Sequence, residues 1–158
     1  MATRNSYYMI EFRNKITSEI LKNKELVELL DSTPEKAIDD LLYQRIYPHE
    51  YIPITLKDAA KYINFDMQTS LNYINKVFTD ITIYFFLLAD DAVLRTSKGL
   101  WYDRVTCVLD EMFTENKILG VGTMSLQENR LYVPTNDIRG RMLTFRVRDF
   151  TDGGKYGK

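Results

Sequence analysis

The stretch DITIYFFLLADD, residues 80 to 91, decides the fold of this 158-residue chain. Successive side chains of a β-strand point to opposite faces of its sheet, so a strand with one wet face alternates apolar and polar residues. Here both registers are mainly apolar, with Ile81, Ile83, Phe85, Leu87 and Ala89 in one and Tyr84, Phe86 and Leu88 in the other. The pattern predicts a strand over residues 78–89 that is buried on both faces.

Something must cover the second face, because burying each large apolar side chain contributes roughly 1.5 to 3 kcal/mol. We expect helices at 9–20 and 101–114 to cover the first face. A third helix, at 34–46, offers cover for the second within one chain, and another subunit is the alternative. Tyrosine is enriched at protein interfaces, and the chain has 11 tyrosines, so we favour the second subunit.

The helices are predicted from apolar residues that recur at steps of three and four. Thr33 and Pro34 suit the N-cap and first position of the helix at 34–46, and Pro48 follows its end. The segment from Pro48 to residue 66 is predicted to be a loop with a short strand near 61–65. The residues of the 34–46 helix expected to be buried are Ala37, Ile38, Leu41, Leu42 and Ile46.

The last third of the chain has a β pattern. In GRMLTFRVRDF, residues 140–150, Leu143, Phe145 and Val147 alternate with Met142, Thr144, Arg146 and Arg148. Two glycines around Val121 favour a bend before it. The order of elements predicts one α+β domain over 1–150, with helices against a mainly antiparallel sheet, and a flexible tail over 151–158.

Composition limits the classes of function. The 21 basic and 22 acidic residues nearly cancel, which gives no broad electrostatic surface for nucleic acid. One cysteine and one histidine exclude an internal disulfide and a Cys/His zinc site. No stretch fits a signal peptide or a membrane span, so we expect synthesis in a reducing cytosol and no membrane contact.

The candidates for chemistry are weak. His49 lies in a loop and is expected to be a surface residue. Cys107, in a predicted helix, is expected to be a small buried hydrophobe. Asp103 and Asp110 share a helix face and are expected to be solvated rather than metal ligands.

One tripeptide, Glu115 to Lys117, has the acid-x-lysine spacing of many metal-dependent nucleases, for which Asp90 or Asp91 would be the upstream partner. The tripeptide alone is weak, and GVG lacks the rest of a phosphate-binding loop. We therefore expect no enzyme activity, no catalytic residue, no cofactor and no metal, and we keep the nuclease as a competing class.

Four segments, GLWYDRVTCVLDEMF, ILGVGTMSL, LYVP and GRMLTFRVRDF, together resemble small neck proteins of tailed bacteriophages. In particular the chain is similar to tail terminator proteins, also called tail completion or head-to-tail joining proteins, from about residue 8 to 150. The resemblance implies an α+β virion protein of the neck that forms a ring, typically of six subunits, caps the tail tube and docks to the head connector.

The implied partners are further copies of the chain, the tail tube protein and the head connector or stopper, with genomic DNA passing through the lumen without sequence-specific binding. A head-closure (stopper) or adaptor protein of the neck is the alternative, although stoppers are more often built around a β-barrel. A closed ring needs two different patches per subunit. The residues expected in those contacts are Tyr84, Phe86, Leu88, Arg146, Arg148 and Phe150.

Overall fold

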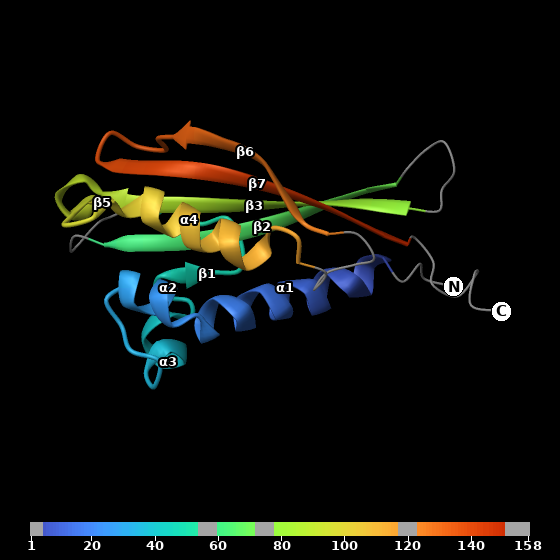
Figure 1. Cartoon of the computed structure of the whole chain (residues 1–158), viewed down its shortest axis with the longest axis horizontal. Helices are drawn as coiled ribbons and strands as arrows, with labels where there is room; N and C mark the ends of the chain where they lie inside the picture. The colour runs from blue at the N-terminus through green and yellow to red at the C-terminus, as the bar shows by residue number, and fades with distance from the viewer. Residues whose placement is uncertain (1–4, 54–59, 72–77, 117–122, 151–158) are drawn as a thin grey trace.

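A computed structural model describes residues 5–53, 60–71, 78–116 and 123–150, apart from the side chains of 5–8, 71, 78–79 and 148–150. Figure 1 shows a twisted sheet with α4 across one face and α1 along one side. The helices are α1 (Asn5–Lys22), α2 (Lys24–Leu29), α3 (Ala37–Leu41), the 3₁₀ turn η1 (Asp91–Val93) and α4 (Trp101–Phe113). The strands are β1 (Ile46–Tyr47), β2 (Lys61–Leu71), β3 (Phe78–Asp90), β4 (Arg95–Thr96), β5 (Gly99–Leu100), β6 (Ser125–Tyr132) and β7 (Ile138–Phe150).

The main sheet has the strand order β1-β2-β3-β7-β6. Only the two-residue strand β1 runs parallel to its neighbour, and the other three pairs are antiparallel. The short strands β4 and β5 form a separate hairpin that leads into α4. This arrangement confirms the predicted α+β class with a mainly antiparallel sheet.

One face of the sheet carries the core. The first apolar register of β3 packs with the buried residues of α1, α2 and α4, as the sequence pattern predicts for α1 and α4. The ring of Phe85 lies at its centre, 5.5 Å from the ring of Phe113 in α4 and 5.6 Å from that of Phe145 in β7. Trp101 is fully buried, and its indole N–H donates to the Leu29 carbonyl at 2.8 Å, which ties the start of α4 to the end of α2.

The helix predicted at 34–46 is much shorter, and it does not cover the second face. It has five residues, and Leu42 already leaves it in an extended conformation. Tyr43 then takes a φ of 57°, in the left-handed region, and the chain turns into β1. The expected burial of Ile38 is therefore wrong, because this side chain is 66% exposed, and α3 packs instead beside α1.

Strand β2 is longer than the sequence indicates, with 11 residues rather than five. Its buried residues Ile63, Phe65 and Met67 face the core. Asn64 and Asp66 alternate with them on the second face, where Asn64 donates to the Tyr51 carbonyl and Asp66 accepts from Arg13 of α1. The predicted bend around Val121 and the predicted tail at 151–158 lie outside the described residues.

Candidate functional site

The second face of β3 is covered within the chain at one end. Leu88 is fully buried and Phe86 is 8% exposed, so the expectation that both lack cover within a single chain is wrong. Gly140 of β7 lies opposite Leu88 and provides the space, since a Cβ built there would come within 2.8 Å of a Leu88 methyl carbon. The ring of Phe86 lies 5.3 Å from that of Tyr132 at the end of β6.

The loop after β1 lies over the same end of this face and is held by polar contacts. The Asn64 side-chain amide donates to the Tyr51 carbonyl at 2.6 Å, and the Tyr132 hydroxyl donates to the Glu50 carboxylate at 3.3 Å. The Arg13 guanidinium of α1 donates to the Pro48 carbonyl. These contacts join residues far apart in the chain, and they hold the loop over the second face. No local sequence pattern predicts this cover.

Ionisable groups in this cover have shifted pKa values. Burial raises the pKa of Tyr47 to about 12, with the nearby Tyr51 and Tyr62 adding to the effect, and the rings of Tyr47 and Tyr51 stack at 4.0 Å. Burial also raises the pKa of Asp66. Hydrogen bonds from Arg13, Met67 N–H and Glu50 N–H, with the charge of Arg13, outweigh that effect and leave the Asp66 pKa below its usual value of 3.8.

The other end of the second face is polar and accessible. Tyr84 is partly exposed, and its hydroxyl donates to Gln68 at 3.3 Å. Arg146 is exposed and stands opposite Thr82 in the register. Arg148 and Phe150 are the register partners of Asp80 and Phe78, but their side chains lie outside the description. Among the six predicted contact residues, the accessible side chains that the structure describes are thus Tyr84 and Arg146.

The edge strand β6 has an unpaired outer side. It pairs with β7 alone among the described strands, and residues 127–131 are exposed in an unbroken run. A register shift between Leu126 and Glu128 bends the strand. At its end Leu131 is 64% exposed and Val133, just beyond it, is 40% exposed. Exposed sheet edges are sites at which further chains add, and bends and charges restrict that addition.

The opposite side of the molecule carries an apolar groove between α1 and α3. Its cavity of about 560 Å³ is lined by Leu21 of α1 and by Ala37, Ile38 and Leu42 of the α3 region, among others. The shortness of α3 produces the groove, because one and a half helical turns cannot fill the surface along α1. No sequence pattern indicated it, since Ile38 and Leu42 were expected in the core.

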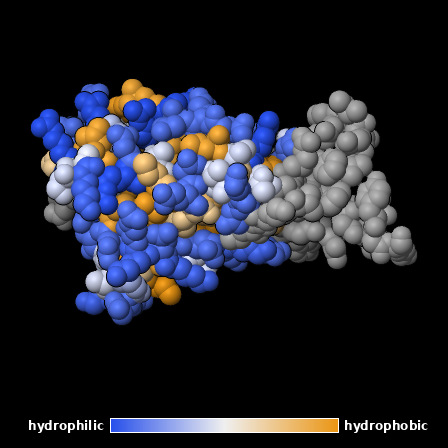
Figure 2. Space-filling view, viewed as in Figure 1, coloured by the Kyte–Doolittle hydropathy of each residue, from blue (hydrophilic) through white to orange (hydrophobic). Residues whose placement is uncertain are grey.

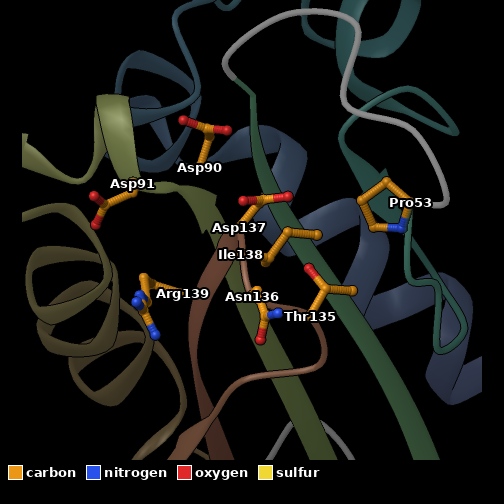
Figure 3. A pocket seen from close by; sticks show the side chains of 8 residues that line it. All are labelled: Pro53, Asp90, Asp91, Thr135, Asn136, Asp137, Ile138 and Arg139. Carbon is orange, nitrogen blue, oxygen red and sulfur yellow. The ribbon is translucent and has the colours of Figure 1, made fainter.

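A polar cavity of about 430 Å³ lies where β3 ends and β7 begins (Figure 3). Asp90, Asp91, Asp137 and Arg139 line it, and one Asp90 carboxylate oxygen accepts from Ala92 N–H at 2.8 Å. Glu115 lies beyond the far end of α4, a helix of 13 residues and so about 20 Å long. The structure does not bring the proposed nuclease residues together, and Lys117 lies outside the described residues.

The remaining candidates are surface residues. His49 is exposed, as predicted, and its Nδ1 lies 2.8 Å from the Glu50 carbonyl oxygen. Cys107 is also exposed, so its expected burial is wrong. The buried stripe of α4 contains Val105, Val108 and Leu109, which leaves Cys107 on the outer side with Asp103 and Glu111.

The described residues offer neither a metal site nor a membrane-spanning helix. No group of three or more acidic, histidine or cysteine side chains in this part of the chain is placed to hold a metal ion. Within the same ranges no helix is both long and apolar enough to cross a membrane.

The sequence profile of the YomW family matches residues 23–147, which span the molecule from α2 to the end of the core in β7. The chain belongs to the YomW family. Members of this family are phage-derived gene products of the SPbeta-prophage type. Membership therefore indicates a phage-associated protein and supports the predicted phage origin, without specifying a role in the tail. A search of curated proteins found no match to this YomW-family chain.

Proposed function

We propose that this YomW-family protein is a tail terminator, a non-enzymatic virion component that forms a ring at the head-tail junction. The resemblance to tail terminator proteins implies a ring of about six subunits. In this role the ring caps the tail tube and docks to the head connector. Genomic DNA would pass through its lumen without sequence-specific contacts. The phage association of the family supports the setting, and the surfaces of the fold support the ring.

The observation that carries the proposal is the outer edge of β6, which no other described strand pairs with, in a sheet whose second face none of the described helices covers. A run of exposed edge residues ending in an exposed leucine is costly for a chain that works alone, because it invites uncontrolled strand addition. In a closed ring the next subunit covers the β6 edge of each subunit, so no edge remains free. The accessible Tyr84 and Arg146 then lie on a surface available to neighbouring subunits and to neck partners.

The architecture favours a terminator over the alternatives. The sheet is open, with distinct edge strands β1 and β6, whereas a stopper of the expected kind is a β-barrel without edges. For the nuclease, Asp90 and Asp91 lie near the beginning of α4 and Glu115 follows its end, too far apart to share one metal ion.

The first test is the particle itself. Size-exclusion chromatography with light scattering of the full chain should give a mass several times that of the 18.6 kDa subunit, and negative-stain images should show rings. A monodisperse monomer at micromolar concentration and above would contradict the proposal.

A second test addresses the enzyme class. Plasmid nicking with magnesium or manganese should be absent from the purified protein. Nicking that is present in the wild type and lost in Lys117→Ala would show a nuclease instead. Activity that persists equally in that variant would indicate a contaminant and leave the ring measurements to decide.

A further inference from the structure

Two apolar surfaces lie on opposite sides of the sheet and have opposite shapes. At the β6 edge, Leu131 and Val133 project from the strand end. Beyond β1, at the other side, the groove between α1 and α3 is concave and lined by Leu21, Ala37 and Leu42. Figure 2 shows apolar surface both at the top of the view, over the tip of β6, and at the bottom, over α3.

We propose that the β6 tip of one subunit, with Leu131 at its centre, docks into the α1–α3 groove of the next subunit. This inference rests on the proposed ring and identifies its subunit contact. The occupant is a second copy of this chain, because the chain itself carries both halves of the fit. The contact is head to tail, with two different patches per subunit.

The register of the sheet places both halves at one level along the strands. Leu131 pairs with Arg141, Arg141 with Leu87, Leu87 with Ile63 and Ile63 with Ile46. Ile46 forms a bridge to Leu42, which lines the groove. Figure 1 agrees, since α3 and the tip of β6 lie toward the same end of the sheet.

This common level favours a ring over a filament. A head-to-tail contact closes into a ring when it rotates each subunit without advancing it along the axis, and otherwise builds an open helix. Because the projecting tip and the groove share one row across the sheet, repeated docking turns about an axis near the strand direction with little rise. The geometry therefore favours closure.

Charge at the two rims is complementary. Exposed Asp39 and Asp40 lie in α3, and exposed Glu35 and Lys36 come just before it. Lys22, at the groove, is within 3.9 Å of Glu19 in its own helix. On the face of Leu131 stands its register partner Arg141, which is partly exposed and lies over the Tyr102 ring. Docking thus brings a mainly acidic rim to a guanidinium, which favours this pairing over tip to tip or groove to groove.

Cysteine cross-linking tests the contact. In a Cys107→Ser background, chains with Ile38→Cys or Leu131→Cys are prepared separately, then mixed and oxidised. A head-to-tail contact should give the disulfide-linked dimer only in the mixture, and the double variant should give a ladder that ends at the subunit number of the ring. A disulfide requires Cα atoms within about 7 Å, so random collision gives little product.

The matched control mixes the Leu131→Cys chain with the unmodified chain, whose exposed Cys107 lies on α4 outside both surfaces. This mixture should stay uncross-linked. Self-linking of Leu131→Cys alone would show a two-fold contact and overturn the inference. Rings without the Ile38–Leu131 link would overturn this contact while the proposed function stands, and a monomer would overturn both.

A charge variant provides a second readout. Leu131→Glu should raise the protein concentration at which rings dissociate by about tenfold or more, because a carboxylate would have to enter the apolar groove. Its thermal unfolding midpoint as a dissociated monomer should match the wild-type monomer, since the residue is exposed. Ser97→Glu, in the exposed turn between β4 and β5, should leave assembly unchanged, and equal dissociation in both variants would overturn the inference.

Discussion

At the scale of single residues, a buried tryptophan holds the helices together. Trp101→Phe removes the indole donor and leaves the Leu29 carbonyl buried without its partner. We expect the free energy of unfolding to fall by about 2 kcal/mol. Because Trp101 is the only tryptophan, circular dichroism in denaturant is the measurement. Cys107→Ser, exposed on the same helix, should change stability by less than about 0.5 kcal/mol, and an equal loss in both variants would contradict this assignment.

Asp66 gives the fold a pH dependence. Its folded pKa lies below the unfolded value, so the native state binds the proton less well, and this stabilisation is present above the unfolded pKa. It is lost as the pH falls through the folded pKa. Unfolding curves from pH 5 down to pH 2 should show a smaller loss of stability for Asp66→Asn than for wild type. Asp103→Asn, at an exposed position on α4, serves as the control and should follow the wild type.

At the scale of elements, one glycine determines how closely three strands approach. A Cβ at Gly140 would meet the Leu87 carbonyl oxygen at 2.6 Å and the Tyr132 carbonyl oxygen at 2.8 Å, both backbone atoms that cannot rotate away. Gly140→Ala should therefore lower the free energy of unfolding by about 1 to 3 kcal/mol, measured by chemical denaturation.

The matched control lies on the same face of the same strand. The Thr144 hydroxyl is buried with no hydrogen-bond partner in the described structure, so Thr144→Val should be neutral or stabilising. A loss at Thr144 as large as that at Gly140 would show that the strand tolerates no change, and would remove the special role of the glycine.

At the scale of the whole molecule, the exposed Arg146 on the second face provides a test of how the subunit contacts neighbouring proteins. Arg146→Glu combined with Arg148→Glu should impair ring assembly, because we expect these arginines to face carboxylates of neighbouring proteins. Light scattering measures the loss, and Lys98→Glu, at an exposed position in the β4–β5 hairpin, is the control. Intact rings with altered DNA binding would instead place the arginines in the lumen.

The sequence by itself determined the parts of the molecule whose side chains repeat at a local period. Phe12, Ile16 and Ile20 mark the buried side of α1, and the alternation of Leu143, Phe145 and Val147 marks β7. Burial of one face leaves such a repeat in the chain, so the α+β class and the long central strand could be predicted from it. YomW-family membership agrees with the predicted phage origin.

Only the tertiary structure decided what covers Phe86 and Leu88, where Ile38 points, and where two apolar surfaces remain free. The cover depends on a glycine in a distant strand and on a loop held by Asn64, and the groove depends on a helix that ends early at Leu41. Contacts between residues far apart in the chain leave no period in the sequence. Their physical origin is the strand register, which sets which side chains share a row and is fixed only when the sheet assembles.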